Sequence, residues 1–371
     1  MKGKNWIRFL IVVLMFSGFS SLVQAQDWVK ILEKIYPLGS PPGYEHQLIN
    51  EIKFFLDSRW LTQTDNLGSL IALSGEKVDY LLASPIDEIG YFVSGFTPDG
   101  FIRIDRAINP PYRLFENHLM GQAVIIWTKK GPVQGIVAQP AVHILTREKR
   151  EQLEKGVTLD DIFIDVGVRS EAELRAKGVE ILDAVTRERK LTFLGSRRLC
   201  GLALADKLFP SLLISTALKI QASKKTGGLG LAWIAQTRVN ARGAKGAQSL
   251  GLINLKNRLE PERTIILTGW PVDESGGEPK LGYGPVLVLG ESQPSALADS
   301  FIKLASTEKI ALQILPGRES SLLRPFQGQG SEAIILGVAV RDMATPAEAV
   351  SLADIDSLLK LIDFWLERRS Q

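Results

Sequence analysis

The chain has 371 residues, of which 45% are hydrophobic and 23% charged. These values are ordinary for a globular protein long enough for two domains and a sizeable core. Its formal net charge is +3, and removing residues 1–25, with three basic and no acidic side chains, leaves 41 basic against 41 acidic residues. This balance excludes an electrostatic basis for binding nucleic acid or an anionic membrane. Cys200 is the only cysteine, so no internal disulfide can form.

Residues 1–25 have the pattern of a secretory signal peptide. Lys2, Lys4 and Arg8 form a basic start, a mostly apolar run follows over residues 9–19, and Ala25 ends a stretch that suits a cleavage site. An uncleaved N-terminal anchor is the alternative, although the apolar run is short for a membrane span. We expect a secreted or periplasmic protein with no membrane contact after cleavage.

The first 90 residues predict helices followed by buried strands. Residues 27–36 and 45–56 carry apolar side chains at helical spacing on either side of a turn rich in proline and glycine. A strand is expected at residues 70–73, and a second apolar run ends in an acidic turn with Asp87 and Glu88. Because ligands bind outside the carboxyl ends of strands in open α/β sheets, we expect this turn to border a functional site.

Between residues 91 and 194 the pattern changes to short strands separated by glycine and proline turns. The expected strands cover residues 100–104, 122–127, 133–137 and 162–166. Charged stretches at residues 147–155 and 171–177 are typical of helices with solvated faces. Many short strands at close spacing favour a small barrel.

The remainder of the chain returns to an alternation of strands and helices. Strands are expected at residues 229–236, 264–267, 286–289, 311–314 and 333–340, and helices at residues 208–220, 294–305 and 352–369, with a further helix beginning at residues 242–247. This order predicts an α/β fold whose mostly parallel sheet is sandwiched by helices. We expect residues 26–90 and 195–371 to form one discontinuous domain, into which residues 91–194 are inserted.

The acidic turn also carries a specific motif. Pro85-Ile86-Asp87-Glu88-Ile89-Gly90 resembles the His-x-Asp-Glu-Ile-Gly motif of the glutamyl aminopeptidase or deblocking-aminopeptidase family. These are two-zinc exopeptidases that build tetrahedral shells, and the family is also described as cellulase-like endoglucanases. Further matching stretches lie at residues 120–124, 135–137, 140–143 and 164–167. The resemblance implies a zinc-exopeptidase-like fold in which the β-rich insert roofs the catalytic cleft and makes the contacts of a homo-oligomer.

The same resemblance implies which positions would hold two zinc or cobalt ions. The histidine of the first motif is Pro85 here, and the bridging aspartate of Ala-Leu-Asp-Asp-Arg is Ala205, followed by Asp206. In the family's Gln-Glu-Glu-Val-Gly-x-Arg-Gly-Ala, the first glutamate is the general base and the second a ligand. Thr237 and Arg238 occupy these places, so neither the base nor the ligand is present.

Two more ligand positions lie further along the chain. An aspartate at the end of the next strand is replaced by Leu267 or Thr268, and the histidine of Arg-Tyr-x-His-x-Pro-x-Glu is Ala344. The chain's histidines, which are His46, His118 and His143, lie away from every expected ligand position. A zinc pair needs imidazoles and carboxylates, so we expect no catalytic residue, no metal ligand and no cofactor. The expected remnant pocket consists of Pro85, Asp87, Glu88, Ala205, Asp206, Thr237, Arg238, Thr268 and Ala344.

Arg238 brings a permanent positive charge to a position where the family has a metal ligand. An uncompensated buried carboxylate costs roughly several kcal/mol, and Asp87 and Asp206 remain close by in the family's geometry. We therefore expect Arg238 to pair with Asp87 or Asp206 and to replace the charge of the metal. The alternative is an arginine that points to solvent from a decayed site.

These substitutions favour a non-catalytic homologue of a metallo-aminopeptidase that keeps a binding or assembly role, with peptides as the expected ligands. The alternative is an active metallo-aminopeptidase that releases N-terminal residues from peptides through an unconventional metal site. A hydrolase with Ser84, Thr237 or Cys200 as nucleophile would need an adjacent base, and no histidine is placed to serve. A purely structural role through the insert is the remaining alternative.

Overall fold

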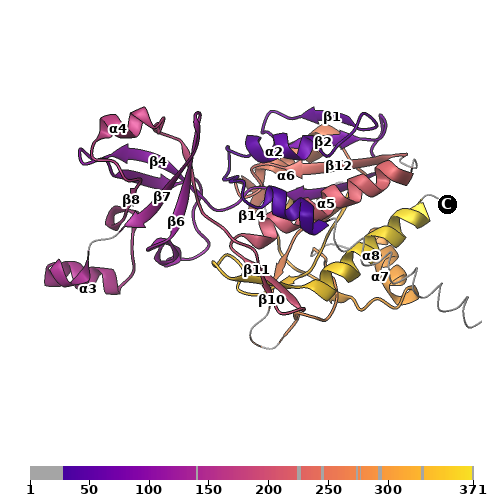
Figure 1. Ribbon diagram of the computed structural model, residues 1–371. Helices are drawn as coiled ribbons and strands as arrows, with labels where there is room; N and C mark the ends of the chain where they lie inside the picture. The colour runs from indigo at the N-terminus through magenta and orange to yellow at the C-terminus, as the bar shows by residue number, and fades with distance from the viewer. Residues whose placement is uncertain are drawn as a thin grey trace, which may run out of the picture.

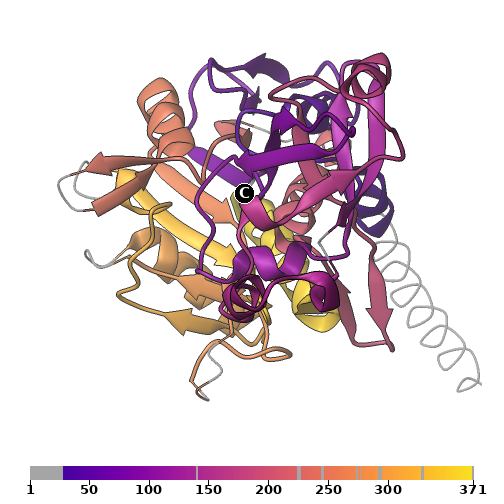
Figure 2. The same cartoon turned by 90° about the vertical axis from the view of Figure 1, so that its left-hand side faces the viewer.

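The computed structural model describes residues 28–138, 141–223, 227–243, 246–272, 275, 277–290, 295–326 and 330–369 (Figure 1). Within these residues the chain forms two lobes, one built on a large sheet and the other on a small barrel. Figure 2 views the molecule from the side of the barrel. The predicted signal peptide lies outside the described residues, as does Pro294, at which a helix was expected to begin.

In the described part of the chain, eight strands form one sheet. In spatial order they are β1 (Leu61–Thr64), β2 (Leu70–Leu73), β12 (Leu229–Ile234), β3 (Tyr80–Pro85), β15 (Arg263–Leu267), β19 (Glu332–Gly337), β17 (Val286–Val288) and β18 (Gln313–Leu315). The central strands β12, β3, β15 and β19 are parallel to one another. The predicted mostly parallel sheet is therefore confirmed, and its antiparallel pairs lie toward the two edges.

The central strands are mostly apolar, as expected for a sheet with helices on both faces. Leu82 of β3 packs on one face, whereas its neighbours Leu81 and Ala83 pack on the other. The first face is covered by a helix at residues 28–35 and by α2 (His46–Lys53), α5 (Leu204–Ser223), α7 (Ala296–Thr307) and α8 (Leu352–Arg369). The second face is covered by α6 (Leu250–Leu259) and the short helix η4 (Arg324–Phe326).

The predicted barrel is present as a closed structure with its own hydrophobic core. Its strands, in order around the barrel, are β4 (Tyr91–Phe96), β5 (Ile102–Arg106), β8 (Phe163–Asp165), β7 (Gly131–Ala138), β6 (Ala123–Thr128) and β9 (Ala184–Arg187). Its helices are η1 (Phe115–Leu119), η2 (Val142–Ile144), α3 (Arg147–Glu154), η3 (Leu159–Asp161) and α4 (Glu171–Ala176). The closing strand β9 was not expected from the sequence, and the exact domain boundaries stay predictions.

The prediction that a helix begins at residues 242–247 is wrong. The segment forms an antiparallel hairpin of β13 (Asn240–Gly243) and β14 (Gly246–Ser249). Gly246 has a φ of 107°, a left-handed conformation that favours glycine and ends helical geometry. The helix α6 starts only after Ser249, whose side chain accepts a hydrogen bond from the Leu252 N–H at 3.3 Å and caps the helix.

Other short strands complete the sheet lobe. The strand expected at residues 333–340 is divided, because β20 (Ala339–Val340) leaves the large sheet and pairs with β16 (Trp270–Pro271). A small antiparallel sheet contains β10 (Thr192–Leu194), β11 (Arg198–Gly201) and β21 (Glu348–Ser351). None of the described helices is long and apolar enough to cross a membrane.

Candidate functional site

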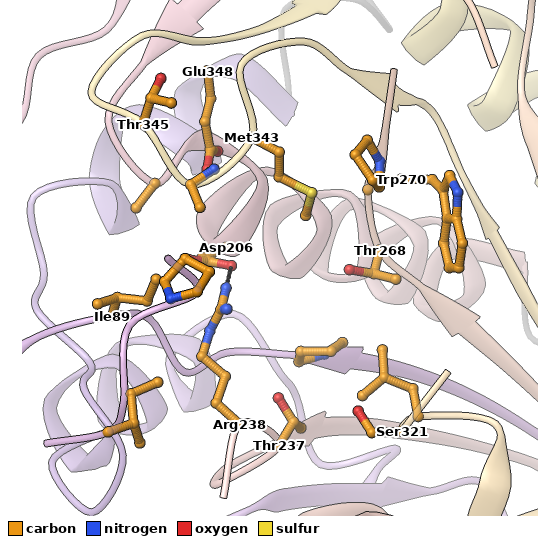
Figure 3. Close-up of a pocket in the computed structure, with 18 of the residues that line it drawn as sticks. Ile89, Asp206, Thr237, Arg238, Thr268, Trp270, Ser321, Met343, Thr345 and Glu348 are labelled. Atoms are coloured by element: carbon orange, nitrogen blue, oxygen red, sulfur yellow. Dashed lines mark hydrogen bonds and ion pairs between the residues drawn. The ribbon is translucent and has the colours of Figure 1, made fainter. Parts of the chain in front are cut away.

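Loops that follow the central parallel strands meet at one edge of the sheet, as their common direction requires. Pro85 ends β3, Thr237 and Arg238 follow β12, and Thr268 follows β15. With Ala344, from the loop between β20 and β21, these residues line a cavity of about 550 Å³ (Figure 3). The structure thus brings together residues that are more than 250 positions apart in the chain.

The other predicted site residues divide between the cavity wall and the layer behind it. Asp206, in the first turn of α5, lines the cavity, as do Pro85, Thr237, Arg238, Thr268 and Ala344. Asp87, Glu88 and Ala205 are buried behind this wall. Asp87 binds Thr237 and Arg238 of the wall from behind, whereas the partners of Glu88 are not among the residues that line the cavity.

The barrel lobe contributes to the opposite side of the cavity. Phe115 from η1 and Arg187 from β9 line it, as do Ile108 and Pro111 from the segment between β5 and η1. The cavity therefore lies between the carboxyl edge of the sheet and the barrel, where two lobes can both contact a bound molecule.

The predicted ion pair of Arg238 is confirmed. Its Nη2 donates to Oδ1 of Asp206 at 2.6 Å (Figure 3). Asp87 binds the same segment differently: its Oδ2 accepts the backbone N–H of Arg238 at 2.7 Å, and its Oδ1 accepts the hydroxyl of Thr237. Arg238 Nε also donates to the backbone carbonyl of Asp87 at 3.1 Å. The alternative, an arginine directed to solvent, is wrong.

Glu348 is a further carboxylate in the cavity wall. Glu348, only 3% exposed, accepts the backbone N–H of Ala205 at 2.9 Å and that of Ala344 at 2.8 Å. Burial, with the negative charge of Asp206, raises the pKa of Glu348 to about 7. Although burial lowers the pKa of Arg238, the charges of Asp206 and Asp87 raise it above its ordinary value, so the guanidinium stays charged.

Glu88 joins three distant segments behind the wall. Its carboxylate accepts the Ser40 N–H at 2.7 Å, binds Arg189 at 2.7 Å and lies 3.6 Å from the Lys207 ammonium group. Burial alone would raise the pKa of Glu88, but Arg189 and Lys207 lower it to about 2. Burial in turn lowers the pKa of Lys207 to about 8. The sequence predicted Glu88 as a pocket residue, but its side chain is buried behind the cavity wall, and Arg189 was not predicted.

The backbone around the cavity is strained at non-glycine residues. Ala203, Gln236, Asp342 and Ala344 have φ values of 51°, 53°, 54° and 65°, a left-handed region that costs such residues roughly 1–2 kcal/mol each. Buried carboxylates hold two of these positions: Glu348 binds the Ala344 N–H, and Glu45 accepts the Gln236 N–H at 2.9 Å. Sequence reasoning missed Glu45, because an acid before a helix also suits ordinary capping.

The residues at this edge do not fit a pair of zinc ions. Across the described residues, no group of three or more His, Cys, Asp or Glu side chains could share a metal ion. The implied ligand positions carry proline, alanine and arginine, and the carboxylate of Asp206 already binds a guanidinium. His118 contacts the hydroxyl of Tyr112 in the barrel lobe at 2.7 Å, and His46 lines a different cavity.

The candidate nucleophiles differ in their surroundings. The hydroxyl of Ser84 is buried and donates to the carbonyl of Pro85 at 3.2 Å. Thr237 lines the cavity, but its hydroxyl donates to Asp87, which also accepts the Arg238 N–H. Burial raises the pKa of the Cys200 thiol, so the reactive thiolate form is disfavoured.

The chain shares its sequence pattern with known proteins. A model of the M42 glutamyl aminopeptidase family matches residues 68–361. The protein named "Putative aminopeptidase FrvX" from Escherichia coli strain K12 is 25% identical over 329 residues, which make up 85% of this chain and 85% of that protein. The match therefore includes both the sheet lobe and the barrel.

Two solved structures share the fold. The TET aminopeptidase of the marine sediment archaeon Thaumarchaeota archaeon SCGC AB-539-E09 superposes with a TM-score of 0.77 at 22% identity, covering 93% of this chain and 97% of that one. The TET1 peptidase of Pyrococcus horikoshii gives a TM-score of 0.77 at 23% identity, covering 91% and 99%. The latter is described as able to assemble into a tetrahedron or a large octahedral shell.

Proposed function

Because the chain belongs to the M42 glutamyl aminopeptidase family, we propose that it is a non-catalytic member whose cavity binds a ligand without hydrolysing it. The observation that carries this proposal is the ion pair of Arg238 with Asp206 in the cavity wall. The resemblance assigns a metal ligand to the position of Arg238. The guanidinium therefore supplies in part the positive charge that a zinc ion would bring to the remaining carboxylates.

This ion pair opposes metal binding on electrostatic grounds. A divalent cation about 4 Å from a guanidinium is repelled by about 8 kcal/mol at an effective dielectric constant of about 20. The acids that could attract it are engaged, since Asp206 binds Arg238, Asp87 binds Thr237, and Glu348 binds two backbone N–H groups. Without a metal or an alternative base, water in the cavity is not activated for attack on a peptide bond.

The test is the metal content of the purified mature chain. The protein is exposed to zinc or cobalt, desalted and analysed by mass spectrometry for metals, and its hydrolysis of aminoacyl-anilides is measured in the same preparation. We expect metal far below one ion per chain and no hydrolysis. Two tightly held ions, or hydrolysis that a chelator abolishes, would instead establish the alternative of an active metallo-aminopeptidase.

Thr237 allows a second test, because it lines the cavity and its hydroxyl donates to the carboxylate of Asp87. If the chain is a hydrolase that uses this hydroxyl, chelator-resistant hydrolysis will be present in the natural protein and absent from the Thr237→Val variant. The proposal expects no hydrolysis in either. The resemblance suggests peptides as the ligand class, because the family's cleft holds peptide N-termini, whereas Arg187, which has no ion-pair partner among the described residues, favours an anionic group in this cavity.

Assembly is a separate part of the proposal. We infer that the chain forms a homo-oligomer, which is supported by related structures: that of Pyrococcus horikoshii TET1 assembles into shells, and another is described as a dodecamer. Mass photometry of the mature protein should give particles heavier than one chain. A single species of one-chain mass at all concentrations would contradict this.

The proposed location is secreted or periplasmic, on the basis of the sequence pattern in residues 1–25. N-terminal sequencing of the protein recovered from its producing cells should give a chain that begins at Gln26. A start at Met1 in a membrane fraction would favour the uncleaved anchor.

A further inference from the structure

Arg187 is a buried arginine for which the described residues provide no ion-pair partner. It ends the barrel strand β9, is 8% exposed and lines the cavity. Its Nη1 is buried without a hydrogen-bond partner, and within the described residues the side chain forms no ion pair. Its guanidinium instead lies over the ring of Phe115, 5.3 Å from the centroid. Buried charges are ordinarily paired, so this guanidinium lacks a negative partner.

The carboxylates of Glu88 and Glu116 lie in this region, and neither forms an ion pair with Arg187: Glu116 is bound through Oε1 by Arg106 at 2.7 Å. Glu88 acts on Arg187 through its charge, but it is already bound by Arg189, Lys207 and the Ser40 N–H. Arg189 adds a further positive charge close by and itself has Nε and Nη1 without partners. The barrel side of the cavity is therefore positively charged.

The rest of the cavity wall is neutral or already paired. Its acids are Asp206, in the ion pair with Arg238, and Glu348, which binds two backbone N–H groups. Around them lie apolar side chains, which include Ile89, Trp270 and Met343 (Figure 3). Arg187 would repel an entering ammonium group, whereas an entering anion would meet its unsatisfied Nη1.

We propose that Arg187 binds the carboxylate of a small molecule with an apolar body, which occupies the cavity between barrel and sheet. A guanidinium presents two parallel N–H groups that match the two oxygens of a carboxylate. The apolar body lies against the side chains around Phe115 and Met343. This inference rests on the proposed function, because it names the ligand class of the same cavity.

The experiment uses the mature full-length chain and four probes that share one apolar body. These are 4-phenylbutyrate, 4-phenylbutylamine, 4-phenylbutanol and 4-phenylbutyl phosphate, tested by calorimetric titration and by the shift in melting temperature. We expect 4-phenylbutyrate to bind and raise the melting temperature, and the amine and alcohol to bind at least about tenfold more weakly. Equal binding of the alcohol, or binding of the phosphate in preference to the carboxylate, overturns the assignment.

Arg187→Met is the decisive variant, and Arg103→Met is its matched control. Arg103 also lies on a barrel strand with its guanidinium over a phenylalanine ring, 4.6 Å from the centroid of Phe163, but it is exposed. Arg187→Met should weaken 4-phenylbutyrate binding about 10- to 100-fold, whereas Arg103→Met should leave it unchanged.

The melting temperature of Arg187→Met without any probe distinguishes a binding role of Arg187 from a packing role. Removing an unpaired buried charge should leave that temperature unchanged or raise it. If Arg187→Met instead lowers it and retains carboxylate binding, Arg187 is a packing residue and the proposal fails. The metal content and hydrolysis of the same preparation test the proposed function independently, so tightly bound zinc would reject that function while the probe titrations still decide the ligand class.

Discussion

At the scale of single residues, the Arg238–Asp206 pair gives the first prediction. Truncating Arg238 to alanine leaves a largely buried carboxylate without its cation. We expect Arg238→Ala to lower the free energy of unfolding by about 1–3 kcal/mol, less than a fully buried pair because the arginine is 31% exposed. Urea unfolding at neutral pH provides the measurement.

Arg175→Ala is the control for this prediction. Arg175 pairs with Glu171 at a similar 2.7 Å, but both side chains are exposed. Exposed pairs contribute roughly 0–1 kcal/mol, so this variant should be close to the natural protein. Equal losses in the two variants would show that the ion pair in the cavity wall has no special stabilising role.

Two buried glutamates predict opposite dependences on pH. Burial, with the charge of Asp87, raises the pKa of Glu45 from 4.5 to about 7. The folded chain therefore holds this proton more tightly than the unfolded chain, and the corresponding stability is lost as the pH rises from about 4.5 to 7. Glu45→Gln keeps the acceptor for the Gln236 N–H and should reduce this loss, by at most about 3 kcal/mol.

Glu88 shows the reverse behaviour. Its pKa is lowered to about 2 against the opposing effect of burial, so its stabilisation is present above about pH 4.5 and is lost as the pH falls toward 2. Glu88→Gln should therefore destabilise the protein at pH 7 and have little effect near pH 2. Unfolding free energies measured across this range for both variants would contradict the assignment if their slopes were the same.

At the scale of elements, Gly337 of β19 leaves less room for an added Cβ than the other described glycines. A Cβ added at Gly337 would lie 1.7 Å from the backbone carbonyl oxygen of Thr268, which the backbone must shift to relieve. We expect Gly337→Ala to cost about 3 kcal/mol, measured by urea unfolding. Gly75→Ala is the control, because nothing lies within 4 Å of the added atom there, and it should be nearly neutral.

The elements also show what the sequence predicted and what it did not. The long apolar runs identified β3, β12 and β15 because buried parallel strands need continuous apolar side chains. The hairpin of β13 and β14 was mistaken for a helix start, since its strands carry few apolar residues to reveal a period of two. Strand β9, which ends at Arg187, was not predicted, and a charged stretch follows it directly in the sequence.

The sequence predicted those site residues that lie in motifs resembling the family's. Arg238 and Asp206 were expected to meet because matching family motifs placed both at one edge, and they do. Arg187 lies in no such motif, and its position depends on how the closed barrel sits against the sheet. Glu45 and Arg189 were likewise invisible in the sequence, since their partners lie about 190 and 100 residues away.

At the scale of the whole molecule, the proposal predicts that metal binding can be restored. The set of substitutions implied by the resemblance is Pro85→His, Ala205→Asp, Thr237→Glu, Arg238→Glu, Thr268→Asp and Ala344→His. We expect this variant to retain about two zinc ions per chain after desalting, against almost none for the natural protein, because the strained backbone around the cavity is already in place.

The same set without Thr237→Glu is the control for catalysis. It keeps the metal ligands but lacks the general base that the resemblance assigns to that position, so it should bind zinc and hydrolyse aminoacyl-anilides far more slowly. If both variants remain folded and neither binds zinc, the prediction is wrong. The backbone at this edge of the sheet then differs from that of the family, and not only the side chains.

The buried carboxylate of Glu88 has a consequence for motion. It lies just before β4, where the chain enters the barrel, and it binds Arg189, just after β9, where the chain leaves, as well as Lys207 on α5. The two chain segments that connect the barrel to the sheet lobe are thereby held together at one point on the sheet lobe. A hinge motion of the barrel would have to break these contacts, so we expect the opening between the two lobes to keep its width when a molecule binds.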